Sequence, residues 1–368
     1  MIIIILRSIL ITHNITKRIL TKKSEKKRYS ICTLGSHCSL QILKGAKDEG
    51  FNTLLICQKK RLSLYKRFNF IDDMIVVDKF NEISHESVQQ HLRNTNSIII
   101  PHGTMIAYMS RQEIEKISTP FFGNKWIIKW EADRKLKEKL MNEALLAIPK
   151  HIESKEKIEK LSIVKLHGAA GGRGYFLAWN RQSFEEGAKK LIEQGVVRSE
   201  GDLYIQEYVN GVPAYLQFFY SPVTKVLEFM GVDRRYESDA DGIGRIPAKQ
   251  QLGIDMHPSY NVIGNIPLVL RESLLEEVYA MGERFVEAAR HLVPPGMIGP
   301  FCIEGVYDRE GNFTTFEFSA RIVAGTNLYI DGSPYSGLLF DKPMSMGRRI
   351  AHEIKIASKQ AKIADILT

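Results

Sequence analysis

The sequence predicts a mixed fold, α/β in its first third and α+β in the rest of the chain. Three patterns predict it: a strand–helix–strand unit over 29–57, two strands around a glycine-rich loop over 161–179, and a hairpin over 299–318. A strand–helix–strand unit implies a parallel sheet, whereas strands joined by short loops imply antiparallel pairs. We therefore expect a parallel sheet first and antiparallel sheets after it.

The first third of the chain alternates apolar runs with a segment of helical spacing. The predicted strands are 29–34, 51–57, 71–77 and 97–100, and the predicted helix is 37–49. The loops 35–39 and 102–104 each follow one of these strands. Because ligands of open parallel sheets bind at the carboxyl ends of strands, we expect both loops to face one cleft.

The rest of the chain predicts two long helices and seven strands. The helices are 130–145 and 272–292, and the strands are 161–166, 175–179, 203–208, 215–220, 226–232, 299–307 and 313–318. The last two strands are joined by the turn 308–312, which contains Asp, Gly and Asn. Such a short connection predicts an antiparallel pair.

The net charge of +9 comes almost entirely from the start of the chain. Residues 1–28 carry eight Lys or Arg against one acid and so account for +7 of it. The rest of the chain is close to neutral, which argues against a broad nucleic-acid-binding face. We interpret residues 1–27 as a basic N-terminal extension and expect ordered structure to begin near Arg28.

The cysteines indicate the compartment of the protein, and its hydropathy argues against a membrane protein. Cys32, Cys38, Cys57 and Cys302 form no CxxC pair and no metal-ligand spacing, so we expect free, buried thiols in the reducing cytoplasm. No stretch approaches the roughly 20 apolar residues of a membrane helix, and we expect no membrane partner. The apolar start of the chain lacks the order and the cleavage site of a secretory signal.

The segment from Lys165 to Tyr175 reads Lys-Leu-His-Gly-Ala-Ala-Gly-Gly-Arg-Gly-Tyr and lies between two predicted strands. The backbone N–H groups of such a loop can approach phosphate closely. Walker loops and dinucleotide loops both open a helix, so neither fits. A phosphate-binding flap fits, with an ordinary hairpin as the alternative. The candidate phosphate contacts are Lys165, Gly171, Gly172, Arg173 and Gly174.

Two glutamates, Glu304 and Glu317, lie on the last pair of strands. A turn symmetric about Glu310-Gly311 places them directly opposite on one sheet face, where like charges repel unless a cation lies between them. Two carboxylates together with substrate phosphates suit Mg²⁺ (or Mn²⁺). The alternative is a solvated face, which the flanking Phe and Ile residues disfavour. An odd-length loop would break the predicted register.

The lysine at the base of a glycine flap and the segment Glu317-Phe-Ser-Ala-Arg321 resemble ATP-grasp enzymes, many of which carry Glu-x-Asn-x-Arg on their last metal strand. The resemblance implies a Rossmann-like N-terminal (pre-ATP-grasp) domain, residues 28–128, followed by a two-subdomain ATP-grasp domain, residues 129–368. It makes Arg321 a γ-phosphate contact, with Ser319 in place of the Asn. The candidates for the first cationic contact to ATP are Arg134, Lys135 and Lys139.

Seven motifs together resemble the archaeal formate-dependent synthetases that make 5-formamidoimidazole-4-carboxamide ribonucleotide (FAICAR) in purine biosynthesis. The motifs are Leu34-Gly-Ser-His-Cys-Ser-Leu40, Pro101-His-Gly-Thr104, Gly168-Ala-Ala-Gly-Gly-Arg-Gly-Tyr-Phe176, Arg235-Tyr-Glu-Ser238, Gly264-Asn-Ile-Pro267, Pro294-Pro-Gly-Met-Ile-Gly-Pro-Phe-Cys302 and Phe316-Glu-Phe-Ser-Ala-Arg321. The resemblance spans essentially Ile31 to Leu367 and leaves the basic extension outside.

The family resemblance also implies roles for single residues. His37, Thr104 and Asn265 contact 5-aminoimidazole-4-carboxamide ribonucleotide (AICAR), Glu207 and Glu237 hold the adenosine part of ATP, and Glu304 and Glu317 hold Mg²⁺. One segment departs from the family pattern. Where the family often has Val-Asp-Gly-Gly-Thr-Asn, this chain has Ile322-Val-Ala-Gly-Thr-Asn327.

The reaction implied by the resemblance joins formate to the 5-amino group of AICAR through formyl phosphate and yields FAICAR, ADP and phosphate. Lys165 and Arg321 act at the phosphoryl group, and His37 orients the substrate, handles a proton or contacts its phosphate. Two alternatives stay open. One is an ATP-grasp paralogue that joins another carboxylate and amine, suggested by Val323-Ala324; the other is a non-catalytic nucleotide-binding regulator whose basic tail contacts nucleic acid. Similar enzymes form homo-oligomers, and we expect the same here.

Overall fold

The computed structural model describes residues 29–166, 175–251 and 262–368. The basic extension and four of the candidate phosphate contacts, Gly171, Gly172, Arg173 and Gly174, lie outside this range. Their roles therefore stay predictions.

The first sheet is parallel, as the strand–helix–strand pattern predicts. Its strands are β1 (Ser30–Leu34), β2 (Asn52–Gln58), β3 (Asp73–Val77) and β4 (Ser97–Ile99), in the order β3-β2-β1-β4. Its helices are α2 (Ser39–Asp48), α3 (Leu62–Tyr65), α4 (Glu86–Asn94), α5 (Gly103–Tyr108) and α6 (Arg111–Glu115). Alternate residues of β1 enter different apolar clusters, Ile31 with α2 and Cys32 with α4, so the strand is buried on both faces.

The end of the chain returns to this first sheet. Helix α14 (Met346–Lys359) packs on α2 so closely that a Cβ at Gly45 would clash with the backbone of Arg348. Phe121 and Thr368 exchange two backbone hydrogen bonds of 3.0 and 2.9 Å. The last residues therefore hold the first sheet against the rest of the molecule.

The prediction of one helix over 130–145 is wrong. The structure has two helices, α7 (Ile127–Ala132) and α8 (Arg134–Glu143), separated by Asp133 in an extended conformation. The Asp133 carboxylate accepts a hydrogen bond of 3.1 Å from the Leu136 N–H and so caps α8. The break turns the chain, so that α7 and α8 present different side chains to the same cavity.

The flap strands belong to a small antiparallel sheet. Its strands are β5 (His151–Ile152), β6 (Ser162–Leu166), β7 (Phe176–Ala178) and β8 (Leu203–Glu207), in the order β5-β8-β6-β7. The β6–β7 pairing confirms the strand–loop–strand prediction. Helix α9 (Arg181–Glu193), which the sequence analysis did not predict, packs Phe184 and Ala188 against this sheet.

The third sheet has five antiparallel strands in the order β11-β10-β9-β12-β13. The strands are β9 (Val212–Ser221), β10 (Val226–Glu237), β11 (Val262–Pro267), β12 (Gly299–Tyr307) and β13 (Phe313–Ser319). The helices of this part of the chain are α10 (Ser238–Ile243) and α11 (Ala248–Gln251) after β10, α12 (Leu275–Leu292) after β11, and α13 (Ser336–Leu339) after β13. Helix α12 lies across one face and buries Phe218, Phe229, Phe301 and Phe318 against it. The predicted strand 226–232 ended too early, because β10 continues through Asp233, Arg235 and Glu237.

The hairpin of β12 and β13 pairs Glu304 with Glu317, as predicted, but by a different route. The loop 308–312 is odd in length, and Tyr307 pairs with Phe313 instead of Thr314. An extra residue, Phe316, then forms a β-bulge that shifts the register by one. The bulge therefore restores the pairing that the assumption of a symmetric turn predicted.

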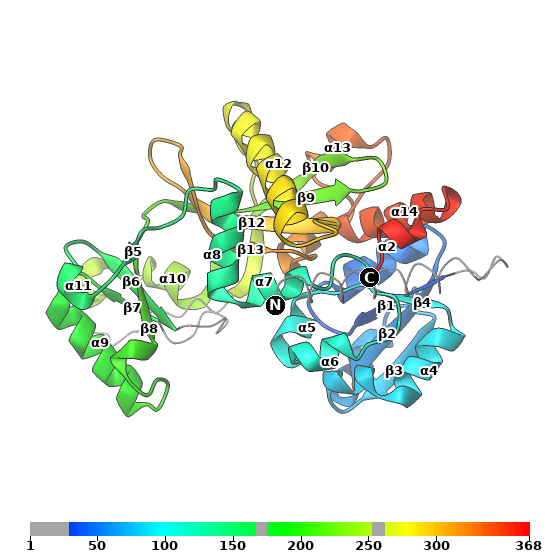
Figure 1. The fold of residues 1–368 in the computed structure, drawn as a ribbon, viewed down its shortest axis with the longest axis horizontal. Helices are drawn as coiled ribbons and strands as arrows, with labels where there is room; N and C mark the ends of the chain where they lie inside the picture. Colours follow the sequence, from blue (N-terminus) through cyan, green and yellow to red (C-terminus); the bar gives the residue numbers. More distant parts are fainter. Residues whose placement is uncertain (1–28, 167–174, 252–261) are drawn as a thin grey trace.

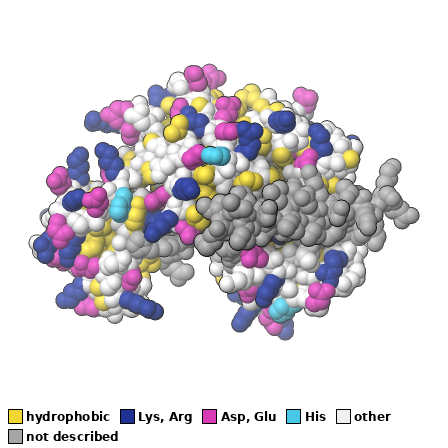
Figure 2. All heavy atoms as spheres, viewed as in Figure 1, with side chains coloured by type: hydrophobic (Ala, Val, Ile, Leu, Met, Phe, Trp, Pro, Cys, Tyr) yellow, Lys and Arg dark blue, Asp and Glu magenta, His cyan; other side chains and the backbone are white. Residues whose placement is uncertain are grey.

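Figure 1 shows the three sheets across the width of the molecule, with the small β5–β8 sheet at one end and the parallel sheet at the other. The five-stranded sheet lies between them under α12. On the face shown in Figure 2, Lys and Arg side chains are interspersed with Asp and Glu side chains. Within the described residues, no helix combines the length and the apolarity needed to cross a membrane.

Candidate active site

A cavity of about 630 Å³ opens where the small sheet, the five-stranded sheet and the loop after β1 meet. Its polar and charged lining comes from segments far apart in the sequence: His37, Arg134, Lys137, Glu138, Lys165, Gln206, Glu207, Arg235, Glu237, Asn265, Glu317 and Arg321. Eight of the candidate site residues from the sequence analysis are among them, namely His37, Arg134, Lys165, Glu207, Glu237, Asn265, Glu317 and Arg321. The cavity is large enough for a nucleotide-sized ligand.

One face of the five-stranded sheet forms the floor of this cavity. Cross-strand pairing aligns Asn265 with Arg235, Tyr215 with Asp233 and with Glu304, and Glu304 with Glu317. Directly paired residues point to the same face, so these side chains form one polar row across all five strands. The Arg235 guanidinium lies 3.9 Å from the centre of the Tyr215 ring.

Each glutamate of the row is paired with a cation. Glu304 is almost fully buried; its Oε2 accepts a hydrogen bond of 2.7 Å from Arg235 Nη2, and its Oε1 accepts one of 2.9 Å from the Ser319 hydroxyl. Glu317 forms an ion pair with Lys137 from α8. Burial is the largest single influence and raises the pKa of Glu317, but the charge and hydrogen bond of Lys137, together with the charges of Arg235 and Arg321, lower the pKa overall. Ser319 thus holds Glu304.

The donor set fits a divalent cation only in part. Hard carboxylate oxygens suit Mg²⁺ or Mn²⁺. Among the described residues, however, no group of three or more His, Cys, Asp or Glu side chains could hold a metal ion. Two carboxylates leave most of a six-coordinate shell to other oxygens. A metal ion here would therefore need phosphate or water oxygens as further ligands.

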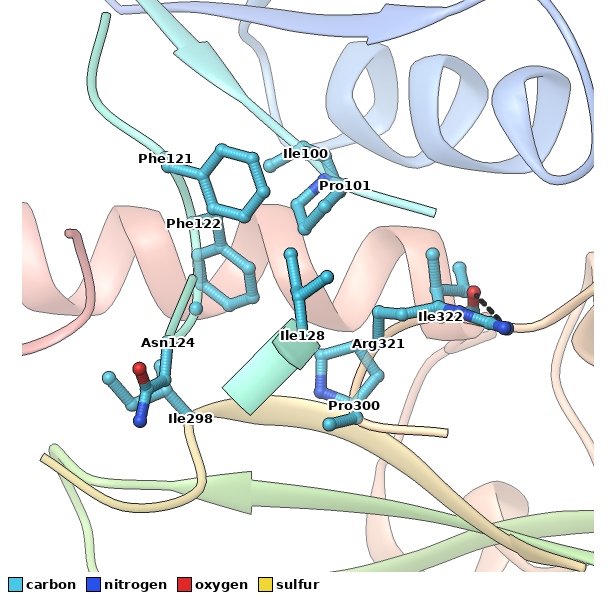
Figure 3. Close-up of a pocket in the computed structure, with 12 residues that line it drawn as sticks. Ile100, Pro101, Phe121, Phe122, Asn124, Ile128, Ile298, Pro300, Arg321 and Ile322 are labelled. Atoms are coloured by element: carbon cyan, nitrogen blue, oxygen red, sulfur yellow. Dashed lines mark hydrogen bonds between the residues drawn. The ribbon is translucent and has the colours of Figure 1, made fainter. Parts of the chain in front are cut away.

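Arg321 is held at the cavity wall by a buried acid. Glu131 on α7 accepts a hydrogen bond of 2.8 Å from Arg321 Nη2 and one of 3.0 Å from the Ala320 N–H. The Arg321 Nε makes no hydrogen bond within the described part of the chain. Figure 3 shows the apolar junction beside it, where Ile128 lies among Phe122, Pro101 and Pro300 while the Arg321 side chain extends away. Glu131 and Arg321 are thus fixed by a packed junction.

The base of the flap carries two further cations. Lys165 Nζ donates a hydrogen bond of 3.2 Å to Gln206 Oε1, and burial together with the Arg134 charge lowers the pKa of Lys165 to about 8. Arg134 Nη2 donates to the Leu166 carbonyl at 2.6 Å, and its guanidinium lies 4.6 Å from the centre of the Tyr204 ring. Of the three candidates for a first cationic contact to ATP, Arg134 lines the cavity, whereas Lys135 and Lys139 do not.

The two loops predicted to face one cleft lie together. His37 has a left-handed backbone (φ 51°), and its ring stacks on that of His102 with centroids 5.8 Å apart. Burial, followed by the charges of Arg321, Arg235 and Arg61, lowers the pKa of His37 to about 4, so the ring is neutral at pH 7. Of the two rings, His37 lines the cavity, whereas His102 is buried behind it.

Thr104 lies one step behind the cavity wall. It is buried in the first turn of α5 and is not among the lining residues. Its N–H donates to His102 Nδ1 at 3.3 Å, and His102 Nε2 bonds to the Leu34 carbonyl at 2.9 Å. His102 is therefore a neutral imidazole with its proton on Nε2.

The segment after β13 joins the first and last parts of the site. His102 forms a parallel bridge with Ile322, and Asn327 Nδ2 donates a hydrogen bond of 3.0 Å to the His37 carbonyl. Gln41 on α2 donates to both Thr326 and Asn327. Val323 and Ala324, which depart from the family pattern, line the cavity itself, as does Gly325.

Sequence reasoning missed several side chains at this site. Asp233 and Arg235 lie two residues apart on β10, but Arg234 stands between them, so no polar–apolar alternation marks them in the sequence. Glu131, Lys137 and Gln206 carry no local signal, because each is defined only by a partner on another element.

Two family profiles match the chain. Residues 31–152 match a family described as a protein of unknown function (DUF1246), and residues 183–368 match one described as a domain of unknown function (DUF1297). Among curated proteins, the chain is 61% identical to the 5-formaminoimidazole-4-carboxamide-1-β-D-ribofuranosyl 5′-monophosphate synthetase of Nitrosopumilus maritimus, over 92% of this chain and 99% of that one. It is 47% identical to the protein of that name from Methanocaldococcus jannaschii, over 94% and 97%.

Solved structures agree with these matches. An IMP biosynthesis protein, PurP, from Thermococcus kodakaraensis superposes with a TM-score of 0.74 at 32% identity, covering 92% of this chain and all of that one. The ADP complex of an N5-carboxyaminoimidazole ribonucleotide synthetase superposes with a TM-score of 0.63 at 12% identity, over 89% of this chain and 76% of that one. The second likeness shows the shared ATP-grasp fold.

Proposed function

The chain belongs to the family of the 5-formaminoimidazole-4-carboxamide ribonucleotide synthetases, and we propose that it joins formate to the 5-amino group of AICAR with the hydrolysis of ATP. It is an ATP-dependent ligase of purine nucleotide (IMP) biosynthesis. One observation carries the assignment of substrates to residues: Lys165, Arg321, Glu317, His37 and Asn265 all line one cavity, and Glu304, which is not a lining residue, pairs with Glu317.

The first step transfers the γ-phosphoryl group of ATP to a formate oxygen and gives formyl phosphate and ADP. Lys165 and Arg321 both line the cavity, from β6 and from the segment after β13, and their charges would stabilise the phosphoryl oxygens as negative charge builds up on them. Glu304 and Glu317 would hold Mg²⁺ or Mn²⁺, which supplies charge neutralisation for the phosphates. Lys137 would leave Glu317 when the carboxylate takes up that role.

Two glutamates at the ends of strands are our candidates for binding the adenosine part of ATP. Glu207 ends β8 and Glu237 ends β10, and both line the cavity. We assign them to the adenosine, and we assign Arg134 to the phosphates because it lies beside Lys165.

The second step is attack of the AICAR amine on the formyl carbon, which releases phosphate and gives FAICAR. His37 and Asn265 are placed to hold the nucleotide, and Thr104 supports the first of these through His102. With a pKa of about 4, His37 is a weak base. We therefore assign it to orienting AICAR by hydrogen bonds and not to removing the amine proton.

Incubation of the protein with AICAR, formate, ATP and Mg²⁺ tests this proposal. We expect FAICAR and ADP to form in equal amounts, with no ADP when formate is omitted. With formate carrying ¹⁸O, one labelled oxygen should appear in the released phosphate, because the attack of the amine breaks the bond between the formyl carbon and the bridging oxygen, and that oxygen leaves on phosphorus. Phosphate without label would contradict the formyl phosphate step, and absence of FAICAR would contradict the proposal as a whole.

A second candidate keeps the mechanism and changes the acid. Val323, Ala324 and Gly325 line the cavity where the family often carries an acidic residue, so the carboxylate that is accepted could differ. Acetate and bicarbonate in place of formate give the comparison. ADP formation that is faster with either of them than with formate would favour a paralogue.

The remaining assignments concern the chain as a whole. We propose that residues 28–128 form a Rossmann-like pre-ATP-grasp domain and residues 129–368 an ATP-grasp domain that binds ATP and supplies Asn265 to the AICAR site, that the protein is a homo-oligomer, and that it acts in the cytoplasm. The four cysteines, all buried and free, support a reducing compartment. The basic extension 1–27 has no part in this proposal.

A further inference from the structure

Asp233 is a buried carboxyl group on the polar row for which the reaction above has no role. It is 1% exposed. Its Oδ1 accepts a hydrogen bond of 2.6 Å from Gln217 Nε2, and its Oδ2 accepts one of 2.8 Å from Asn265 Nδ2. No ion pair to Asp233 is formed within the described residues, although burying a charge without one is costly.

The chemistry of these groups fixes the orientation of two amides. A carboxylate only accepts hydrogen bonds, so each amide must turn its NH₂ group toward Asp233. A flipped Asn265 would place its oxygen against a carboxylate oxygen and lose the bond. With Nδ2 held by Asp233, Asn265 turns its carbonyl oxygen away from the sheet, and Asn265 is a lining residue of the cavity.

Asp233 also supports the segment that follows Arg321. Gly325 approaches it so closely that a Cβ at this position would collide with both carboxylate oxygens. The same carboxylate therefore touches Asn265 on β11 and the segment 323–325, two parts of the cavity wall that are far apart in sequence.

We propose that Asp233 is a positioning residue for the acceptor nucleotide. It holds Asn265 with its Oδ1 toward the cavity, so that the site accepts a hydrogen bond from an N–H group of the substrate, on the 5-amino or the carboxamide group. This inference rests on the proposed function, because it names how AICAR is recognised there. A substrate with an acceptor at the same place would meet the Asn265 oxygen and be rejected.

The test exchanges the two polar partners. Asp233→Asn keeps the shape, but its amide offers a donor that lets Asn265 flip. We expect kcat/KM for AICAR to fall about 10- to 100-fold while KM for ATP stays unchanged. The double variant Asp233→Asn with Asn265→Asp places an acceptor oxygen on the cavity side again. It should recover most of the AICAR kcat/KM lost in the single variant.

Four results decide the matter. Equal losses for AICAR and ATP, or no recovery in a double variant that melts at the same temperature as the single one, would overturn the role of Asp233. Gly325→Ala, which displaces the carboxylate without removing its charge, should also raise KM for AICAR selectively, and it replaces Asp233→Asn if that variant does not fold. FAICAR formation by the unaltered protein separates these results from a failure of the proposed function.

Discussion

The two faces of the five-stranded sheet are made by the same strands and differ in almost every property. Phe301 and Glu304 lie three residues apart on β12 and are equally buried, at 1% and 2% exposure. Phe301 faces α12 and stacks on Phe218 and Phe285 with ring centroids 5.0 and 5.1 Å away. Glu304 lies on the opposite, polar face and accepts hydrogen bonds from Arg235 and Ser319, although it is not itself a lining residue of the cavity. Burial therefore does not distinguish core from site here; the kind of partner does.

The comparison indicates a division of labour. The apolar face stabilises the fold by removing surface from water. The polar face holds charged side chains that need partners on other elements, Arg235 on β10 for Glu304 and Lys137 on α8 for Glu317. Burying such charges costs stability, so the arrangement is explained by ligand binding. Substitutions on the two faces should therefore have opposite consequences for stability and activity.

The largest effect should come from the apolar face. Phe301→Ala removes a ring that stacks between two others, and we expect the free energy of unfolding to fall by about 3–5 kcal/mol. Denaturant titration measures it. Val212→Ala on the half-exposed start of β9 is the matched control and should cost less than about 0.5 kcal/mol. Similar losses for both variants would show that this face is not the core we describe.

A substitution on the polar face should have the next largest effect, and it should change activity without changing stability. Glu317→Gln keeps the size of the side chain and removes half of the carboxylate pair. We expect kcat/KM to fall about 100- to 1,000-fold and the Mg²⁺ concentration for half-maximal rate to rise. Because Glu317 is partly exposed, its ion pair with Lys137 contributes at most about 1 kcal/mol to stability.

Glu310→Gln, in the exposed turn of the same hairpin, is the control for that measurement and should leave the rate unchanged. An inactive Glu310→Gln protein, or a Glu317→Gln protein with normal Mg²⁺ dependence, would remove the distinction between the two faces.

A third prediction concerns the flap side of the cavity and the pH. The free-protein pKa of Lys165 is about 8, below that of an ordinary lysine. Phosphate binds the protonated amine, so ATP should bind with its highest affinity below pH 8, and the affinity should fall as the pH rises above 8. The Kd should increase about tenfold per pH unit there. Calorimetric titration of Lys165→Arg, whose charge persists, should give a flat profile; parallel profiles would exclude Lys165 as the titrating contact.

The smallest expected effect comes from a residue that reaches the substrate only through another. Glu131→Gln keeps hydrogen bonds to Ala320 and Arg321 but removes the charge that orients the Arg321 guanidinium. We expect kcat to fall about three- to tenfold with KM for AICAR unchanged. An unaltered kcat in steady-state assays would mean that the packed junction alone positions Arg321.

Local patterns predicted much of this fold. Strand–helix–strand spacing predicted the parallel sheet, and the strands around the glycine loop predicted the β6–β7 pair. The Glu304–Glu317 pairing was also predicted, although the register depends on a bulge at Phe316 that compensates an odd-length loop. These features depend on side-chain periodicity and on short loops, which neighbouring residues encode.

Other features have no local encoding. Nothing near residue 233 shows that β10 continues, because charged residues in a strand make sense only once a cavity lies beside them. The break at Asp133 is different, because it does carry a local signal: Asp is a weak helix former and a preferred N-cap residue, and the prediction of one continuous helix overlooked it.

The sequence by itself thus determined most of the sheet strands and the Glu304–Glu317 pairing, whereas the phosphate-binding role of the glycine loop stays a prediction. Tertiary structure alone decided which residues share the cavity. Asn327 meets His37 across 290 positions of sequence, Arg321 meets Glu131 across 190, and Asp233 meets Asn265 across 32. Each contact depends on how sheets pack against one another, and that packing is a property of the whole apolar core, which no single segment carries.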